Sequence, residues 1–190
     1  MEGSDSGSGS TFVLSQRYIG ARVTRALEGI DPLAIARAVE ILVKAPQIFV
    51  YGAGRSGIIG RAFAMRLVQA GLRAYVIGES VTPLVRAGDA VFLLSAQGES
   101  YSSIQTGNIV RREGAQLIVL TSKPESKIAH TATHLLTVEF ESDPDQPQYA
   151  PLGTLFEEAS LRLTDGLIAE LLRVRGETEE SMRRRHAIMV

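Results

Sequence analysis

Short apolar runs alternate with longer amphipathic stretches along most of the chain, and this alternation predicts its secondary structure. We interpret the short runs as five buried strands, at residues 48–51, 74–77, 90–95, 117–122 and 134–140. Spacings of three and four residues between apolar positions predict helices at 56–70, 101–113, 125–132 and about 153–173. Alternating buried strands and helices are typical of a parallel sheet covered on both faces. We therefore predict an α/β fold, a doubly wound three-layer sandwich with a five-stranded parallel sheet.

Two helices are predicted before the first strand. Apolar residues from Phe12 to Ile30 fall close to one helical face. Asp31-Pro32 then supplies an N-cap and a first-turn proline for a second helix, which Ala45-Pro46 ends.

The C-terminal part of the chain contains a predicted loop and a predicted tail. Residues 141–152 hold three prolines and three acidic residues, and we expect a surface loop that leads back to the ligand-binding edge of the sheet. Residues 177–190 change from acidic to basic, the direction that suits a helix dipole. We predict a short helical tail there, which would need a partner surface to stay folded.

Composition and charge narrow the class of protein. After Met1, residues 1–10 contain only Gly, Ser and acidic residues, which predicts a disordered tail or linker, and we expect residues 11–190 to form a single domain. Twenty basic and 21 acidic side chains give a net charge of −1, so no global field attracts nucleic acid or an anionic membrane. Cys is absent, and no apolar run reaches the roughly 18 residues of a membrane span. We expect a soluble, cytoplasmic protein.

A glycine-rich turn follows the first predicted strand, in 51-YGAGRSGIIGRAFAMRL-67. Gly52, Gly54 and Gly57 match the G-x-G-x-x-G spacing, and free amides at the start of the following helix would attract an anion. Glu79 lies near the end of the second strand, where a dinucleotide-binding protein has its ribose contact. The turn alone therefore leaves a dinucleotide and a phosphorylated sugar as alternatives, with an unliganded tight turn as the third.

Two further polar clusters follow the third and fourth predicted strands. In 95-SAQGES-100, hydroxyls, a carboxamide and backbone amides precede a helix and together could surround a phosphate. In 121-TSKPES-126, Thr121, Ser122 and Lys123 occupy the next strand end. Each serine could also be an ordinary helix N-cap, but the repetition of such clusters at neighbouring strand ends favours a phosphate site.

The order GAGRSG, SxxGES, TSxPxS and GTLFE resembles the sugar isomerase (SIS) domain family, and most closely its 6-phospho-3-hexuloisomerases. The similarity extends from about Phe12 to His186. The resemblance implies the doubly wound fold, assembly as a homotetramer, and interconversion of D-arabino-3-hexulose 6-phosphate with D-fructose 6-phosphate. It also implies a place in carbohydrate metabolism, in ribulose monophosphate formaldehyde fixation, where the functional partner is hexulose-phosphate synthase.

The resemblance also implies substrate-binding residues. Those that match the family's loops are Gly54, Arg55, Ser56, Ser95 and Ser100, and Gln97 and Gly98 belong to the same loop as the last two. The family usually has S-G-S-G-E-T where this chain has S-A-Q-G-E-S. Gln97 still donates through its amide, but Ala96 tolerates positive φ less well than glycine, so this loop is expected to hold phosphate differently.

Two residues are candidates for the proton transfers. Moving a carbonyl between neighbouring carbons needs a base that removes and returns a proton, and Glu157, in the first turn of the helix after GT, matches the family's base. Glu158 points about 100° away, and the apolar rhythm of the helix does not choose between the two glutamates. His186, which follows three arginines, is the second candidate, and the resemblance suggests that it reaches a neighbouring subunit's site.

Cofactors and other functions are the remaining question. His130 and His134 stand four residues apart, but no nearby carboxylate completes a metal site, so we expect neither metal nor other cofactor. Two alternatives to the isomerase are a non-catalytic sugar-phosphate-binding module and a nicotinamide-binding reductase that uses the glycine turn.

Overall fold

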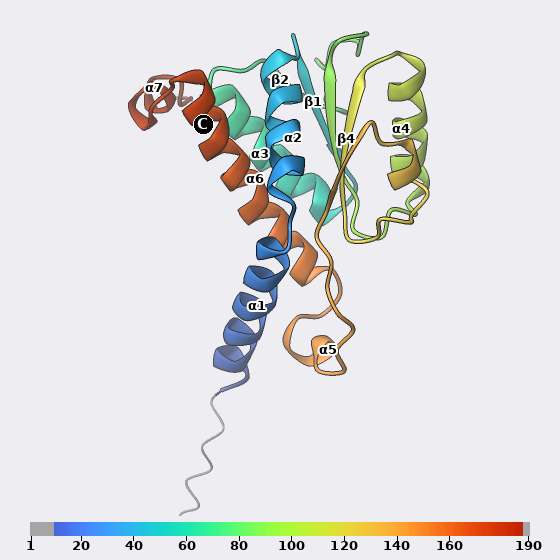
Figure 1. Ribbon diagram of the computed structural model, residues 1–190, viewed down its shortest axis with the longest axis vertical. Coiled ribbons are helices and arrows are strands. Elements are labelled where there is room, and N and C mark those ends of the chain that lie inside the picture. The colour runs from blue at the N-terminus through green and yellow to red at the C-terminus, as the bar shows by residue number, and fades with distance from the viewer. Residues whose placement is uncertain (1–9, 188–190) are drawn as a thin grey trace, which may run out of the picture.

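A computed structural model describes residues 10–187 of the protein (Figure 1). Five parallel strands form one sheet in the order β2-β1-β3-β4-β5. They are β1 (Ile48–Gly52), β2 (Ala74–Val76), β3 (Ala90–Leu94), β4 (Gln116–Thr121) and β5 (His134–Thr137). The predicted doubly wound α/β sandwich is thereby confirmed. Residues 1–9 of the predicted disordered tail and residues 188–190 of the predicted helical tail lie outside the described range.

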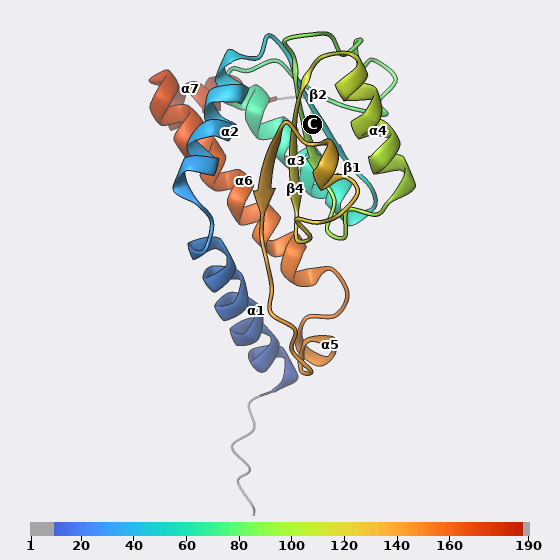
Figure 2. The ribbon, with the colours of Figure 1, turned by 45° about the vertical axis from the view of Figure 1, so that its right-hand side comes forward.

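Helices cover both faces of this sheet. They are α1 (Thr11–Glu28), α2 (Pro32–Lys44), α3 (Arg55–Gln69), α4 (Tyr101–Arg112), α5 (Gln146–Tyr149), α6 (Thr154–Arg175) and α7 (Glu179–Arg184), with a 3₁₀ turn η1 (Ala129–Thr131). Figure 1 shows α4 to the right of the strands and α3 and α6 to the left. Figure 2 shows α1 and the start of α6 extending below the sheet towards α5.

Alternate residues of each strand enter two separate cores. Val50 and Phe92 pack with α2, α3 and α6, whereas Phe49 and Val91 pack with α4 on the other face. All four side chains are fully buried. Because both faces are covered, the strands are apolar at nearly every position, which is why they appear as continuous runs in the sequence.

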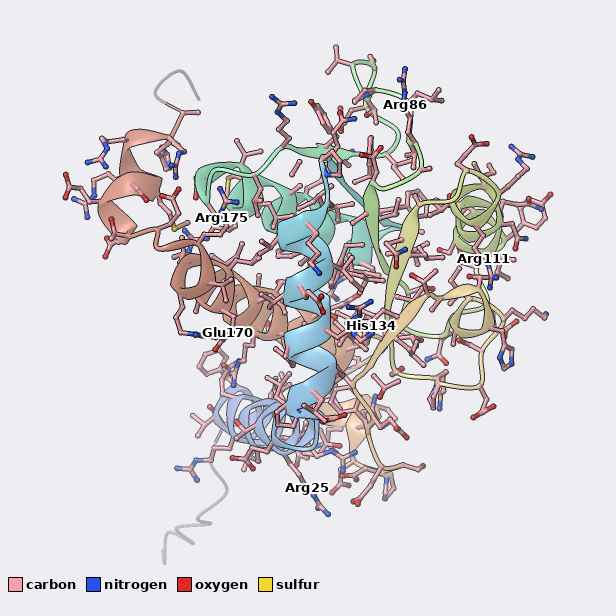
Figure 3. The ribbon with its side chains drawn as sticks, turned by 45° about the horizontal axis from the view of Figure 1, so that its top comes forward. Arg25, Arg86, Arg111, His134, Glu170 and Arg175 are labelled. Atoms are coloured by element: carbon pink, nitrogen blue, oxygen red, sulfur yellow. The ribbon has the colours of Figure 1, made fainter. Side chains whose placement is uncertain are left out.

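The two leading helices begin and end as predicted. Ser10 accepts a hydrogen bond from the backbone N–H of Val13 and caps α1. Asp31 Oδ1 accepts from the N–H of Leu33 at 2.9 Å, and Pro32 is the first residue of α2. Figure 3 shows α2 lying in front of the sheet, where His134 Nε2 is 2.8 Å from the carbonyl oxygen of Ala34.

The helix predicted at 125–132 is wrong, since only Ala129–Thr131 is helical and its turn is 3₁₀. The backbone N–H groups that an α-helix would use there bond elsewhere. Lys127 N–H donates to Glu99 Oε1 at 3.3 Å, and Ile128 N–H donates to the carbonyl of Gly98 at 3.1 Å. Both acceptors belong to the loop after β3, so tertiary contacts replace the local helical bonds.

Two other segments differ from their predicted extent. The last strand ends at Thr137 instead of 140, because its neighbour in the sheet, β4, ends at Thr121, which pairs with Thr137. The loop predicted at 141–152 contains the single helical turn α5, which packs against α1 through a hydrogen bond from Ser15 Oγ to the carbonyl of Tyr149.

The helical tail finds its partner surface within the same chain. Met182 of α7 is buried against the far end of α3, and Arg185 Nη1 donates to the carbonyl of Gln69 at 3.2 Å. Arg185 also pairs with Glu177 at 2.8 Å. Hydrogen bonds from Arg185 and then Ser181 lower the pKa of Glu177 to about 2. These contacts place His186 beside the C-terminal end of α3.

Glycine is required where α3 crosses the end of β1. A Cβ at Gly57 would lie 2.4 Å from the carbonyl oxygen of Gly52, and a Cβ at Gly52 would lie 2.8 Å from the nitrogen of Gly57. β1 cannot shift away from α3 to make room, since it pairs with β2 on one side and β3 on the other. The glycines therefore serve close strand–helix packing.

We expect Gly57→Ala to lower the free energy of unfolding by about 1–3 kcal/mol, because the added methyl group meets backbone atoms. Gly20→Ala is the matched control, since Gly20 lies inside α1 with open space around it. It should raise the free energy of unfolding by about 0.5–1 kcal/mol. Denaturant titration of both variants checks this, and equal effects at the two positions would contradict the packing account.

Leu152 has an unusual backbone just before α6. Its φ is 55°, and among residues 10–187 it is the one non-glycine residue with positive φ. The residue is 92% exposed, so burial does not offset the strain. A left-handed L-residue costs about 1–2 kcal/mol.

Leu152→Gly should therefore stabilise the fold by about 1 kcal/mol, because glycine adopts this φ freely. Leu84→Gly is the control: Leu84 is also an exposed loop leucine, but its φ is not positive. There the same substitution should destabilise by about 0.5 kcal/mol through the entropy of the unfolded chain. Thermal unfolding compares the two, and a loss of stability in both would refute the strain at Leu152.

Candidate functional site

The candidate site lies where the carboxyl ends of β1, β3 and β4 meet. β1 and β3 are adjacent, but α3 follows β1 on one face of the sheet and α4 follows β3 on the other. Such a reversal opens a crevice at the strand ends, and ligands of doubly wound proteins bind there. The structure thus brings the loops at 53–54, 95–100 and 122–128 to one edge, as the sequence predicts.

The loop after β3 presents its polar groups around the N-terminus of α4. Ser95 is buried, Gln97 is exposed, and Gly98 has a φ of 67°. Ser100 is the N-cap of α4, where its Oγ accepts from the N–H of Ser103 at 3.3 Å. The positive φ falls on Gly98 and not on Ala96, so the Ala substitution adds no backbone strain.

The loop after β4 supports this loop from beneath. The carbonyl of Ala96 accepts from Ser122 Oγ at 2.8 Å, from Thr121 Oγ1 at 3.1 Å and from the N–H of Ser122 at 3.1 Å. We interpreted these hydroxyls from sequence as a third phosphate-binding cluster. Their hydrogens instead bond to the neighbouring loop, and Lys123 is the member of that cluster whose side-chain end has no partner within residues 10–187.

Ser126 fixes the identity of Gly98. A Cβ at residue 98 would lie 2.0 Å from Ser126 Oγ, so glycine is required there by space as well as by φ. Ser126 Oγ is buried and has no hydrogen-bond partner among residues 10–187. The hydroxyl serves as a small spacer under the loop.

Glu157 points inward from the first turn of α6, and Glu158 points to solvent. The Glu157 side chain is 12% exposed, and its Oε2 lies 2.8 Å from Arg55 Nε. The N–H is not directed at this oxygen, which has no hydrogen-bond donor among the described residues. Arg55 is itself 63% exposed, so solvent screens the attraction. The structure thus joins the glycine turn, through Arg55, to the candidate base.

The carboxylate lies over Gly153. A Cβ at residue 153 would be 3.0 Å from Glu157 Oε1, so glycine leaves the room that this carboxylate occupies. Gly54, with a φ of 58°, is the N-cap of α3 just before Arg55, and Ser56 is half-buried in the first turn. From the sequence, Gly153 was identified only as the glycine of the GTLFE motif, and its contact with Glu157 was not predicted.

A cleft of about 300 Å³ lies between these elements. Its walls come from the loop after β3, the loop after β4, the segment 140–146 and the start of α6, and they include Gln97, Ser122, Lys123, Leu152 and Phe156. Gly153 also lines the cleft, so Glu157 adjoins it. Sequence reasoning placed the segment 141–152 near the site but did not name Leu152 as a lining residue, for which its position next to Gly153 was the available signal.

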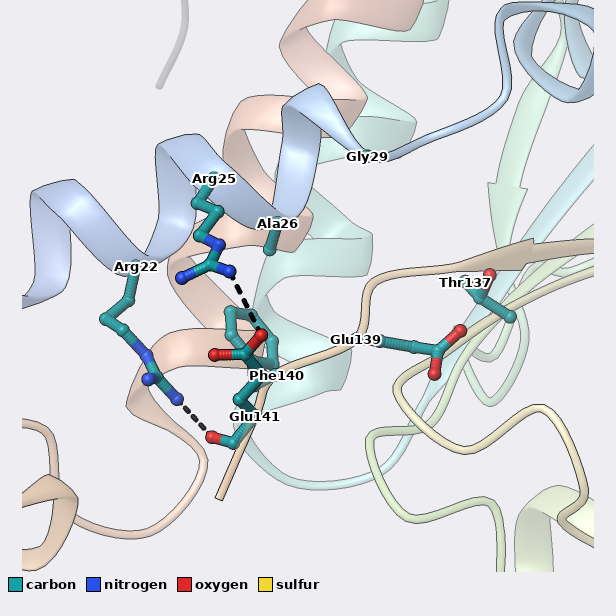
Figure 4. Close-up of a pocket in the computed structure, with 8 residues that line it drawn as sticks. All are labelled: Arg22, Arg25, Ala26, Gly29, Thr137, Glu139, Phe140 and Glu141. Carbon is teal, nitrogen blue, oxygen red and sulfur yellow. Dashed lines mark hydrogen bonds and ion pairs between the residues drawn. The ribbon is translucent and has the colours of Figure 1, made fainter. Parts of the chain in front are cut away.

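A second pocket, of about 370 Å³, lies between α1 and the segment after β5 (Figure 4). Its two arginines are already engaged: Arg25 pairs with Glu141 at 3.1 Å, and Arg22 donates to the carbonyl of Glu141. Arg22 also pairs with Asp143 at 3.3 Å. These cations hold the segment 139–143 against α1, and none of the predicted site residues lines this pocket.

The glycine turn has little room for a dinucleotide. Its cavity is about 40 Å³, lined by Gly52, Gly57 and neighbouring residues, which is close to the volume of one water molecule. Glu79, the proposed ribose contact, pairs with Arg61 of α3 at 2.6 Å. Both observations disfavour the nicotinamide-binding interpretation.

His186 is not brought to Glu157 within one chain. It lies with Arg66, Gln69 and Met182 at the far end of α3, whereas Arg55 begins that helix. Fifteen helical residues separate the two ends by about 20 Å. The two candidate catalytic residues therefore do not share a site in the single chain.

The described residues contain no group of three His, Cys, Asp or Glu side chains placed to hold a metal ion. His134 is occupied by its contact with Ala34, and His130 is exposed. Among the helices of residues 10–187, none is long and apolar enough to cross a membrane.

Known proteins resemble this chain in sequence and fold. The SIS domain profile matches residues 41–152. A protein of Archaeoglobus fulgidus is 36% identical over 84% of this chain and 90% of its own. A 3-hexulose-6-phosphate isomerase of Methylomonas aminofaciens is 34% identical over 87% of this chain and 90% of its own. A crystal structure from Methanococcus jannaschii, described as inferring the function of 3-hexulose-6-phosphate isomerase, has a TM-score of 0.84 and 26% identity, covering 93% of this chain and 99% of that one. The chain belongs to the SIS domain family.

Proposed function

We propose that the protein is an isomerase that interconverts D-arabino-3-hexulose 6-phosphate and D-fructose 6-phosphate. The observation that carries the proposal is the inward Glu157 carboxylate, 12% exposed, beside a cleft that the loop after β3 also lines. A base next to an anion-binding loop is what ketose isomerisation of a phosphosugar requires. The relatives that bear the isomerase name support the choice of substrate.

The phosphate would bind at the loop after β3. Backbone N–H groups at the N-terminus of α4 attract an anion, and Ser95, Gln97 and Ser100 offer further donors. Ser100 Oγ accepts from the N–H of Ser103 and lies 3.0 Å from Ser102 Oγ. When Ser102 is the donor of that pair, the hydrogen of Ser100 Oγ can donate to the phosphate. With the phosphate held there, the sugar carbons would extend along the cleft towards Gly153 and Glu157.

The chemistry would proceed through an enediolate. Glu157 removes the proton from C2 of the 3-hexulose, and the electrons move onto O3. The proton then returns from Glu157 to C3, while the O2 hydroxyl loses its hydrogen, O3 gains one, and a carbonyl forms at C2. Atoms and electrons balance within the substrate, so no external oxidant or cofactor enters. Arg55 lies beside Glu157 Oε2, and the other oxygen, Oε1, would take the proton.

His186 would act in a neighbouring subunit of a homotetramer. Its distance from Glu157 within one chain, on a tail fastened by Arg185 to the end of α3, supports a contribution between subunits. There it would move protons between the substrate oxygens. We further propose that the enzyme acts in the cytoplasm, in ribulose monophosphate formaldehyde fixation, together with hexulose-phosphate synthase.

A coupled assay tests the function. Freshly made 3-hexulose 6-phosphate should be converted to fructose 6-phosphate, which a reporter enzyme detects. Glu157→Gln should keep phosphosugar binding but reduce kcat by at least about a hundredfold, because the base is lost. Glu158→Gln is the matched control and should retain activity within about twofold, since Glu158 faces solvent.

Four outcomes would count against parts of this proposal. Wild-type protein that turns over no substrate, although an active synthase supplies it, would refute the isomerase. Phosphosugar binding without turnover would favour a sensing module, and thermal stabilisation by NAD or NADP but not by sugar phosphates would favour a reductase. Full activity of Glu157→Gln would remove this residue from the mechanism.

Mixed oligomers test whether His186 contributes to the site of a neighbouring subunit. Glu157→Gln and His186→Ala proteins, each expected to be weakly active, are unfolded together and refolded as mixed oligomers. About a quarter of the sites in a random mixture would combine an intact Glu157 with an intact His186 from different subunits, so activity should return to roughly that level. Unchanged activity after mixing would place His186 outside any shared site.

A further inference from the structure

We infer that Lys123 supplies the positive charge that binds the substrate's phosphate in this protein. The inference rests on the proposed function but assigns a residue that the SIS motifs leave open, since the matching pattern TSxPxS has no fixed residue at this position. Lys123 lines the same 300 Å³ cleft as Gln97, from the opposite loop.

Charge pairing around the cleft singles out this lysine. Lys127 pairs with Glu99 at 3.0 Å, Arg55 pairs with Glu157 at 2.8 Å, and Glu141, which also lines the cleft, pairs with Arg25. Within the described part of the chain, no carboxylate lies within 4.0 Å of the Lys123 ammonium group. Lys123 is therefore the cation of this cleft that remains available for an anion.

The backbone holds Lys123 at the cleft wall. Its N–H donates to Thr121 Oγ1 at 3.2 Å, and the preceding Ser122 bonds through both N–H and Oγ to the carbonyl of Ala96. Pro124 follows and restricts the backbone of Lys123 to extended conformations. The side chain of Lys123 therefore starts from a fixed backbone position, one residue after the contact between Ser122 and Ala96 that joins the two loops.

A dianion at this cleft would be bound more tightly with such a cation. The loop 95–100 carries no basic residue, its acid Glu99 is turned to Lys127, and a hydroxyl of the related motif is replaced by the carboxamide of Gln97. A carboxamide donates neutral hydrogen bonds, whereas an ammonium group donates charge-assisted bonds that are about twice as strong. Lys123 would offset the weaker donor at position 97.

Lys123→Gln tests the inference, because glutamine keeps a polar side chain but removes the charge. We expect KM for 3-hexulose 6-phosphate to rise roughly five- to tenfold while kcat stays within about twofold. Lys123→Arg should restore most of the affinity. Lys44→Gln is the matched control, since Lys44 pairs with Glu40 at the end of α2, and its KM should equal that of the wild type.

Binding measurements separate this inference from the proposed function. Calorimetric titration with fructose 6-phosphate and with inorganic phosphate should show both ligands weakened in Lys123→Gln by similar factors. If fructose 6-phosphate alone is weakened, Lys123 contacts the sugar and the phosphate assignment is overturned. If the wild type binds and turns over substrate but Lys123→Gln matches it, the inference fails while the isomerase stands. If the wild type does neither, both fail.

Discussion

The shape of the candidate site depends on hydrogen bonds between two loops that follow neighbouring strands. Parallel strands end side by side, so the loops after β3 and β4 emerge close together. The carbonyls of Ala96 and Gly98 both point into the later loop and accept its donors. Without these bonds, water would have to satisfy the two carbonyls. The backbone of the loop would then not be held in one conformation at the N-terminus of α4.

This one constraint explains why the hydroxyls of Thr121 and Ser122 are already bonded and why residues 125–132 do not form the predicted helix. Thr121 and Ser122 have the composition of an anion-binding cluster, and residues 125–132 have the apolar spacing of a helix. Both properties are local, whereas the bonds that decide the outcome reach across to Ala96, Gly98 and Glu99. Side-chain and backbone donors that serve tertiary contacts cannot be recognised from spacing, because the acceptors lie about 25 residues away in the chain.

Most of the fold could be predicted because it follows from burial. Phe49 and Val50 enter opposite cores, so the strand has no polar side and stands out as an apolar run. Asp31-Pro32 specifies a helix start by local chemistry alone. The choice between Glu157 and Glu158 could not be made in the same way, since α6 carries apolar residues around much of its circumference, and only its packing on α1 and α3 turned Glu157 inward. The position of His186 depended equally on tertiary contacts, through Arg185 and the end of α3.

The hydrogen bonds beneath the loop after β3 make the path of its backbone independent of its side chains. Main-chain carbonyls take the bonds from Thr121, Ser122 and Ile128, so the identity of residues 96 and 97 is not needed to hold the backbone. Evolution can then change the donors that face a ligand without rebuilding the fold around them. In this chain the side chains of Ala96 and Gln97 have no part in that support, so under the proposed function substitutions at these two positions would change the contacts to a ligand without changing the path of the loop.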